Sequence, residues 1–335
     1  MKKYVNLFVF VFMIGACLSQ GRAQTKSAVS YKNPVVDIAM PDPTVIKAAD
    51  GYFYVYATES TRNVPIMKSK DLVEWTYCNT AFTNKTRPRF EPKAGIWAPD
   101  INYINGKYVL YYAMSVWGGE QTCGIGVATA DSPQGPFTDH GKMFRSNEIG
   151  VQNSIDPSLL QYEGRNYLVW GSFRGIYVIE LTADGLSIMS GAKKKRIAGT
   201  AFEAVYIHKH GDYYYMFASI GSCCQGVKST YKVVVGRSKK VWGPYKDKTG
   251  KPMLKNGYSL VIGANDHFVG NGHGSQIIQD DAGQDWLLYH GFSRSTPENG
   301  RILLLDQIKW DHEGWPYVEG GSPSYETQKA PVFNN

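Results

Sequence analysis

The amino-acid sequence predicts an all-β protein built as a five-bladed β-propeller. One short pattern, a glycine followed by a strand-like run of aromatic and aliphatic residues, occurs five times in the 335 residues. Successive copies are 55, 58, 47 and 72 residues apart, which is close to the length of a four-stranded blade with its loops. No long stretch has the helical period of about 3.6 residues. These observations together predict one all-β domain.

Each copy of the pattern is predicted to form the second strand of a blade, reached across a turn from the first strand. The copies are residues 51–56, 106–111, 164–170, 211–217 and 283–289. In the first unit the apolar residues 43–46 precede the repeat across a turn, and residues 65–69 and 72–75 form a second hairpin. Four strands in each of five units predict about 20 strands. The propeller is expected to occupy residues 30–325.

One ionisable residue precedes the repeat glycine in each unit. These residues are Asp42, Asp100, Asp156, Glu203 and His273. Because the first strand of a propeller blade lines the central channel, we expect the five side chains to converge on one mouth of that channel. Clustered carboxylates repel one another, and this cost is usually tolerated only where chemistry or a cation requires it. The sequence therefore predicts a functional site at the hub.

Short motifs around these positions resemble those of family 43 glycoside hydrolases, and the resemblance covers nearly all of the mature chain. The motifs are Pro41-Asp42-Pro43-Thr44, Trp97-Ala98-Pro99-Asp100, Ser154-Ile155-Asp156-Pro157-Ser158, Phe202-Glu203-Ala204 and Gly272-His273. The resemblance implies a five-bladed propeller that hydrolyses arabinan, xylan side chains or related pentose glycans. It therefore implies a glycoside hydrolase.

The resemblance also implies roles for three carboxyl groups. Asp42 would be the general base, Glu203 the general acid, and Asp156 the residue that orients the acid and raises its pKa. An inverting hydrolase places its acid and base about 6.5–9.5 Å apart, which leaves room for the attacking water. Side chains from the first and fourth blades can meet that distance across a hub.

Two longer stretches resemble the endo-acting 1,5-α-L-arabinanases of the family. One comprises residues 223–231, 235–238 and 243–245, and the other comprises residues 171–173 and 175–176. The resemblance implies plant cell-wall arabinan or arabino-oligosaccharides as substrates. Two departures leave endo action open, because Pro41 replaces the usual histidine and residues 270–274 read Gly-Asn-Gly-His-Gly in place of Gly-Pro-Gly-His-Asn. Exo-acting α-L-arabinofuranosidase and β-xylosidase are the alternatives within the family.

Further site residues are expected around the three carboxyl groups. Aromatic rings suit the apolar face of a furanose, which makes Trp117 and Tyr206 candidates beside the expected substrate-binding set of Trp97, Asp100, Asn153, Ser172 and Phe173. The resemblance implies a calcium ion at the hub with His273 as its ligand. The altered segment 270–274 leaves this metal site open.

Two other functions compete with the family 43 interpretation. A carbohydrate-binding propeller without catalysis would keep the aromatic residues but has no need of three separated carboxylates. A retaining fructan hydrolase has the same architecture, but such enzymes read Asn-Asp-Pro-Asn where this chain has Pro41-Asp42-Pro43-Thr44. Both rivals are therefore disfavoured.

The N-terminus predicts export from a bacterial cell. Lys2 and Lys3 precede an apolar run over residues 5–16 and then small residues, as in a signal peptide of residues 1–23. Cleavage after Ala23 would release the protein, whereas residues 14–17 resemble a lipoprotein box that ends at Cys17. We expect a periplasmic, secreted or lipid-anchored protein. The apolar run is too short for a transmembrane helix.

Charge and cysteine content say little about partners. The formal charge of +7 falls to +4 when the leader removes Lys2, Lys3 and Arg22, and the remaining charges are interspersed, so no nucleic-acid partner is predicted. Beyond Cys17 the cysteines are Cys78, Cys123, Cys223 and Cys224. Four cysteines allow three pairings, and a bond between the two adjacent ones would strain the backbone. We expect a monomer.

Overall fold

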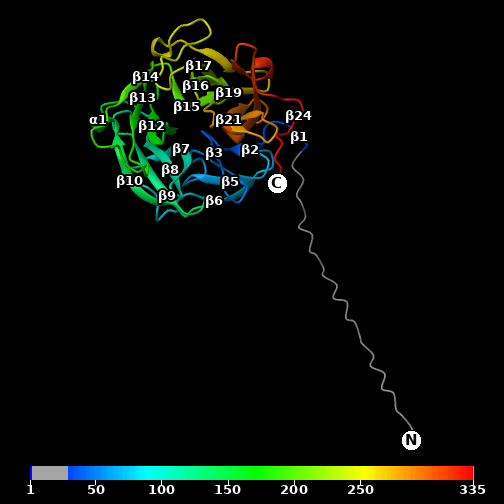
Figure 1. The fold of residues 1–335 in the computed structure, drawn as a ribbon, viewed down its shortest axis with the longest axis horizontal. Helices are drawn as coiled ribbons and strands as arrows, with labels where there is room; N and C mark the ends of the chain where they lie inside the picture. Colours follow the sequence, from blue (N-terminus) through cyan, green and yellow to red (C-terminus); the bar gives the residue numbers. More distant parts are fainter. Residues whose placement is uncertain (2–28, 335) are drawn as a thin grey trace.

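The computed structural model describes Met1 and residues 29–334, and it confirms the five-bladed β-propeller. Five sheets of four or more strands stand around a central axis within the described residues (Figure 1). In blade two, β10, β9, β8 and β7 follow one another from the rim to the centre (Figure 1). Residues 2–23 of the predicted leader, including Cys17, lie outside the described residues. None of the described helices is long and apolar enough to cross a membrane.

The first three blades each use four consecutive strands. Blade one consists of β3 (Thr44–Lys47), β4 (Phe53–Tyr56), β5 (Pro65–Ser69) and β6 (Thr76–Thr80). Blade two consists of β7 (Gly95–Ile104), β8 (Lys107–Ser115), β9 (Gly124–Ala130) and β10 (Thr138–Arg145), and is followed by the short helix α1 (Ser146–Ile149). Blade three consists of β11 (Ser158–Tyr162), β12 (Arg165–Trp170), β13 (Ile176–Glu180) and β14 (Lys195–Ala198).

The fourth blade keeps this order, whereas the fifth takes a strand from the other end of the chain. Blade four consists of β15 (Glu203–His210), β16 (Tyr213–Ile220), β17 (Lys232–Ser238) and β18 (Ser259–Ile262). Blade five consists of β19 (Phe268–Gly272), β21 (Asp285–Ser293), β22 (Ile302–Trp310) and β2 (Val36–Ala39), with the short strands β20 (Ile278–Gln279) and β23 (Pro316–Tyr317) beside it. The described 3-10 turns are η1 (Gly226–Lys228), η2 (Met253–Lys255), η3 (Pro297–Asn299) and η4 (Glu319–Gly321).

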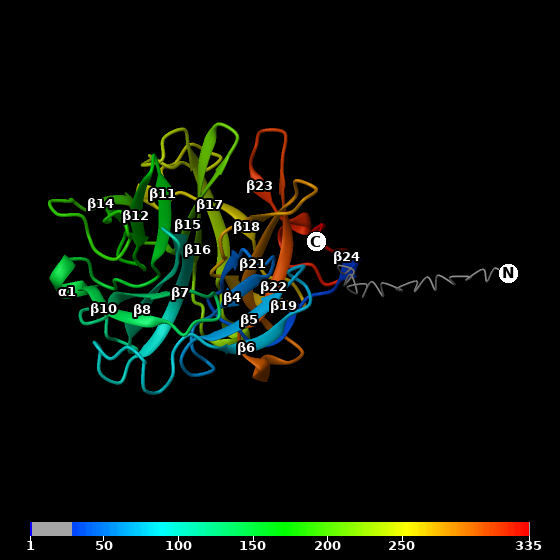
Figure 2. The same ribbon diagram turned by 60° about the horizontal axis from the view of Figure 1, so that its bottom comes forward.

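The two ends of the chain close the ring. In blade five β2 pairs antiparallel with β22, so that Val36 lies opposite Leu303. A separate ribbon joins β1 (Ser30–Tyr31) to β24 (Gln328–Lys329). Figures 1 and 2 both show the C-terminus next to β24. The pairing of β2 with β22 covers an edge of the blade-five sheet that would otherwise be free to pair with another chain.

The repeated glycine of the sequence occupies the same place in every blade. It ends the turn between the innermost strand and the second strand, as Gly51 does before β4 and Gly106 before β8. All five repeat glycines have a positive φ, between 53° and 83°. A β-carbon added at Gly51 would meet no atom within 4 Å, so the backbone conformation, and not space, favours glycine there. The repeat therefore marks the blade register.

Hydrophobic side chains fill the spaces between adjacent blades. One buried cluster joins blades one and five through Phe53 and Val55 on one side and Trp286 and Leu303 on the other. Facing sheets bury the aromatic and aliphatic residues that the repeat supplies. This packing holds the innermost strands in place around the channel.

The innermost strands share a backbone feature that aims side chains at one end of the channel. At the cleft end of the channel each blade carries a non-glycine residue with positive φ in or beside its innermost strand: Asp42, Ala98, Asp156, Ala204 and His273, with φ of 39–55°. Non-glycine residues adopt this left-handed conformation only at an energetic cost. Its recurrence in every blade marks the end of the channel where the functional site is found.

Candidate active site

A cleft of about 700 Å³ opens at this end of the channel. Four of the five ionisable residues predicted from the repeats line it: Asp42, Asp156, Glu203 and His273. Its size lies in the range of about 300–1,000 Å³ that is usual for ligand sites. The cleft is therefore large enough for more than one pentose unit.

Asp42 is held by partners from two blades. Its Oδ2 accepts a hydrogen bond from Thr58 Oγ1 at 2.6 Å, and its Oδ1 accepts one from Arg301 Nη1 at 2.8 Å. Its backbone N–H donates to His290 Nδ1 at 3.0 Å. Burial raises the pKa of this carboxyl, but the charges of Arg301 and His273 outweigh burial and hold the pKa well below its usual value. Asp42 is therefore ionised over a wide pH range.

The pKa values of the two histidines beside Asp42 are shifted in opposite directions. Burial and the Arg301 guanidinium hold the pKa of His290 well below its usual value, so this ring is neutral, and its Nδ1 accepts the Asp42 N–H. At His273 burial lowers the pKa, but the carboxylates of the cleft raise it further, and the net shift is upward. His273 Nδ1 lies 3.3 Å from Asp42 Oδ1. The ring can therefore carry a positive charge next to Asp42.

Asp156 and Glu203 form an acidic pair with raised pKa values. Burial, together with the negative charges of Glu203 and Asp42, raises the pKa of Asp156 to about 8. Burial also raises the pKa of Glu203, although hydrogen bonds from Ser172 and Tyr231 oppose the rise. Ser172 Oγ donates to Glu203 Oε2 at 2.6 Å. The pair therefore retains a proton at neutral pH, in the same cleft as an ionised carboxylate.

The other predicted substrate-binding residues also line the cleft, with one exception. Trp97, Asn153, Ser172 and Phe173 belong to its wall, and Asn153 Nδ2 donates to Ser172 Oγ at 2.9 Å. The candidate Trp117 is also in the wall, 5.6 Å from Trp97 between ring centroids. Trp117 is 78% exposed, so its ring is accessible from solvent.

Asp100 does not line the cleft, although it was predicted to bind substrate there. It lies inside β7, two residues beyond the left-handed residue Ala98, which occupies the blade-two position equivalent to Asp42. Asp100 is 1% exposed and accepts hydrogen bonds from Tyr206 Oη at 2.6 Å and Leu159 N–H at 2.7 Å. Neither Asp100 nor Tyr206 is among the residues that line the cleft. Both belong to a buried network between blades.

A calcium site built by protein oxygens does not fit the surroundings of His273. Calcium takes 6–8 oxygen ligands, whereas Asp42, the carboxylate beside His273, is already surrounded by Arg301 and two imidazoles. Within residues 29–334, no group of three or more closely spaced His, Cys, Asp or Glu ligand atoms includes His273. No chemical step is therefore assigned to an ion at this position.

The adjacent cysteines form part of the cleft wall. The structure joins Cys223 to Cys224 by a disulfide bond, the pairing that the backbone argument disfavoured. They lie in the loop between β16 and η1. Cys78 and Cys123 are free thiols.

Several partners of the carboxyl groups lie outside the motifs that indicated the site. Thr58, Arg301 and His290 all contact Asp42 but lie outside the repeated motifs. His290 offered one signal, because it is an ionisable residue that directly follows the buried hydrophobic run 286–289 in strand β21. Tyr231, beside Glu203, belongs to a stretch that carries the family resemblance. No local motif indicated Arg301, because it is separated from Asp42 by 259 positions in the chain.

Comparison with known proteins gives consistent matches. The model of glycosyl hydrolases family 43 matches residues 31–316. The extracellular exo-α-(1→5)-L-arabinofuranosidase ArbA of Cellvibrio japonicus is 36% identical over 306 residues, which cover 83% of this chain and 86% of that protein. The extracellular endo-α-(1→5)-L-arabinanase 1 of Bacillus subtilis is 36% identical over 289 residues, which cover 82% and 86%.

The solved structures agree with these matches. The Cellvibrio cellulosa α-L-arabinanase complexed with arabinohexaose superimposes with a TM-score of 0.77 at 34% identity, covering 86% of this chain and 98% of that chain. The family match spans most of the propeller, and the family resemblance read from the motifs is confirmed. The chain therefore belongs to glycosyl hydrolases family 43.

Proposed function

We propose that the protein is an inverting endo-1,5-α-L-arabinanase that cleaves plant cell-wall arabinan. One observation carries the proposal: a single cleft holds an ionised carboxylate, Asp42, and a proton-bearing pair, Asp156 and Glu203. An inverting glycosidase needs these two protonation states, one on each side of the bond that breaks. Two relatives act on α-1,5-linked arabinose chains, which supports the choice of substrate.

In the proposed mechanism Asp42 is the general base. Arg301 and Thr58 each occupy one of its oxygens, and a carboxylate oxygen has a second lone pair with which to accept a proton from water. The same contacts keep the carboxylate ionised and fix its orientation. Asp42 would therefore draw a proton from a water molecule as that water attacks the anomeric carbon.

Glu203 is the proposed general acid. Ser172 Oγ donates to Oε2, which helps to orient the carboxyl that would give its proton to the glycosidic oxygen. Asp156 and Glu203 repel each other when both are ionised, so the pair holds one proton to a higher pH than either carboxyl alone would. Asp156 Oδ2 accepts a hydrogen bond from the Ala204 N–H at 3.1 Å. As the glycosidic bond breaks, the proton passes from Glu203 to the leaving oxygen and the base gains one from water.

The alternative is an exo mode that releases arabinose or one short product from a chain end. The chain is 36% identical to an exo-acting relative and 36% identical to an endo-acting one, so sequence identity does not choose between the two modes. The test is to incubate the mature protein with linear 1,5-α-arabinan and to separate the products by size over time. Early oligosaccharides of mixed length support endo action, and steady release of one small product supports the exo mode. No release would direct the search to xylosides and exclude arabinan.

The stereochemistry is tested in the same reaction. Proton NMR of the first products distinguishes the anomers before they equilibrate. We expect products of inverted configuration. Products of retained configuration would contradict the inverting mechanism, although arabinan would still be the substrate.

The pH dependence of kcat/KM should have a wide plateau. Activity should rise as Asp42 ionises, well below the usual carboxyl pKa, and should fall as the pair Asp156–Glu203 loses its proton near pH 8. Replacing Asp156 by asparagine removes the carboxyl that repels an ionised Glu203, so the pKa of the acid should fall and the alkaline limb should move to lower pH. An alkaline limb that does not move would contradict the role of Asp156.

Arg301→Met should move the acid limb. The guanidinium lowers the pKa of Asp42, and loss of such a partner typically raises a carboxyl pKa by about 1–3 units. The acid limb of kcat/KM should therefore move upward by that amount, while the alkaline limb stays in place. The matched control is Arg165→Met, which removes an exposed ion pair with Glu180 on blade three. A profile unchanged from the parent would show that Arg301 does not set the charge of Asp42.

Calcium is a separate part of the proposal. His273 would be the single protein ligand of a hub ion, with water in the other positions, because the nearby carboxylate is already paired with cations. Calcium should raise the melting temperature of the chelator-treated parent, and the variant His273→Gln should lose that response. The same rise in both proteins would place the ion elsewhere.

We also propose that the protein is exported and monomeric. Residues 1–23 would be removed, which leaves Gln24 as the first residue, or lipid attachment at Cys17 would anchor the chain. Mass spectrometry of the mature N-terminus from the native host distinguishes these outcomes, since only the second leaves a modified Cys17. Light scattering of the mature protein tests the monomer.

A further inference from the structure

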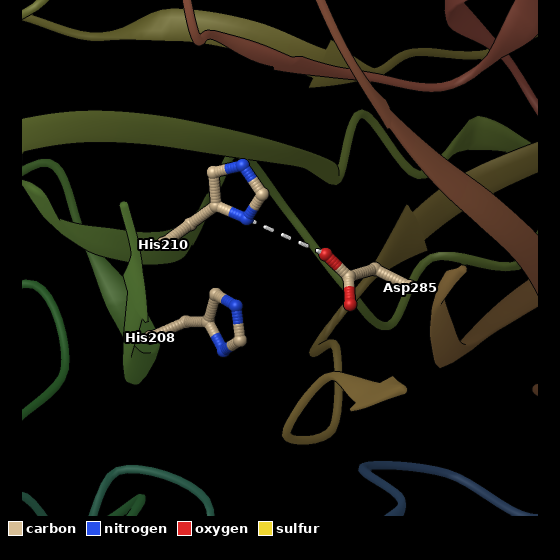
Figure 3. A group of neighbouring side chains, drawn as sticks. All are labelled: His208, His210 and Asp285. Carbon is tan, nitrogen blue, oxygen red and sulfur yellow. Dashed lines mark ion pairs between the residues drawn. The ribbon is translucent and has the colours of Figure 1, made fainter. Parts of the chain in front are cut away.

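A second group of ionisable side chains lies far from the cleft, at the other end of β15. His208 and His210 alternate along this strand of blade four, and Asp285 begins β21 of blade five. One ligand atom from each of the three lies within 4.8 Å of the others. Figure 3 shows both imidazoles pointing from the same strand toward the Asp285 carboxylate.

The group is separate from the catalytic carboxyls. Glu203 begins β15 and His210 ends it. At about 3.3 Å per residue, His208 and His210 lie roughly 16–23 Å along the strand from Glu203. None of the three side chains lines the cleft. The catalytic proposal therefore gives them no role.

The carboxylate is oriented toward the two rings by neighbours. Asp285 Oδ2 accepts the Trp310 Nε1–H at 2.7 Å, and Oδ1 accepts Gln279 Nε2 at 3.2 Å. Two of the roughly four lone-pair positions of the carboxylate are then still available. The His210 ring stacks on Trp310, with centroids 3.7 Å apart and planes 8° from parallel. Outer hydrogen bonds of this kind commonly fix the ligands of a metal site.

The imidazoles have nitrogen lone pairs to offer. His210 Nδ1 lies 3.7 Å from Asp285 Oδ2, which is beyond hydrogen-bond distance, and His208 makes no side-chain hydrogen bond within residues 29–334. A neutral imidazole is the form that binds metal ions. The side chain of Asp285 is 4% exposed and that of His210 is 38% exposed, so the group is open to solvent on one side.

We propose that His208, His210 and Asp285 bind a divalent transition metal ion of the zinc class, with water as the fourth ligand. Two imidazole nitrogens and one carboxylate oxygen suit zinc, whereas calcium requires more oxygen. Ligand atoms around tetrahedral zinc are about 3.3 Å apart, given bonds of about 2.0–2.1 Å. The three ligand atoms lie within 4.8 Å of one another, so binding would require rotation of the histidine side chains to bring them closer. The ion would link blade four to blade five.

The test uses the mature protein without a histidine tag, freed of metal by dialysis against a chelator. Isothermal titration with ZnCl2 should show one saturable site, and Co2+ should give the visible absorption bands of a four-coordinate complex. The variants His208→Gln and His210→Gln should raise the Kd for zinc by more than about 10–100-fold. A loss of about 10–100-fold is typical when a residue that only hydrogen-bonds to a metal ligand is removed. Zinc should raise the melting temperature of the parent and not of these variants.

Matched controls separate this site from other histidines. His140→Gln on blade two should bind zinc as the parent does. Arabinan hydrolysis by His208→Gln and His210→Gln reports whether each variant is folded, because the cleft is remote. If His208→Gln does not fold, the partly exposed His210→Gln still gives the answer. No saturable binding by the parent, or equal affinity in the folded variants, would overturn the proposal without affecting the proposed hydrolase.

Discussion

Glu203→Gln is expected to lower kcat on linear 1,5-α-arabinan by about 10²–10⁴-fold, the usual contribution of a general acid or base. Glutamine keeps the size of the side chain and can still accept the hydrogen bond from Ser172, but it has no proton to give to the leaving oxygen. The fall should therefore appear in kcat more than in KM. Initial rates over a range of arabinan concentrations measure both.

A change of leaving group makes this prediction specific to the acid. An arabino-oligosaccharide with dinitrophenol at its reducing end loses a phenolate that needs no protonation. On this substrate the Glu203→Gln variant should recover most of the parent rate. Glu74→Gln, at an exposed side chain on blade one, is the matched control and should behave as the parent on both substrates. An equal loss on the two substrates would show that Glu203 is not the acid.

Asp42→Asn should also lower kcat on arabinan by about 10²–10⁴-fold. Unlike the loss in Glu203→Gln, this loss should remain when the leaving group needs no protonation. Asparagine cannot accept a proton from the attacking water, and good departure of the leaving group does not replace that step. The amide oxygen can still accept the hydrogen bond from Arg301 or Thr58, so the site should keep its shape. Rates on arabinan and on the dinitrophenyl oligosaccharide, measured side by side, check the prediction.

Stability must be measured together with this variant. Neutral asparagine removes the negative partner of the partly buried Arg301 and His273, and an uncompensated charge destabilises a protein. Melting followed by circular dichroism shows whether the loss of activity comes from unfolding. Asp212→Asn, at an exposed turn before β16, is the matched control. A folded Asp42→Asn variant that regains its rate on the activated substrate would remove Asp42 from the role of base.

Much of the fold could be predicted because its signals are local. The turn glycine and the aromatic strand that follows it lie within a few residues of each other, so the five copies identified β4, β8, β12, β16 and β21. The place of β2 could not be predicted in this way. Its pairing with β22 joins positions more than 250 residues apart, and short strands carry little information on which edge they cover.

Part of the candidate site could also be predicted from local motifs. Asp42, Asp156, Glu203 and His273 occur in short motifs, and the structure brings all four to one cleft. Asp100 has the same kind of motif, but it lies two residues further along its strand than the equivalent left-handed position. The register of β7 against β8 also shifts between Trp97 and Asp100, which changes where the Asp100 side chain lies. Motif spacing alone did not detect this shift.

The sequence by itself determined the blade repeat, the family and the residues with the chemistry for hydrolysis, because each depends on residues close together in the chain. Only the tertiary structure decided which carboxyl is charged, since the pKa of Asp42 depends on Arg301 and His273, and those of the pair depend on burial. It also brought His208 and His210 of blade four to Asp285 of blade five. Electrostatic interactions act across space, and closing the ring places residues from distant parts of the chain within their reach.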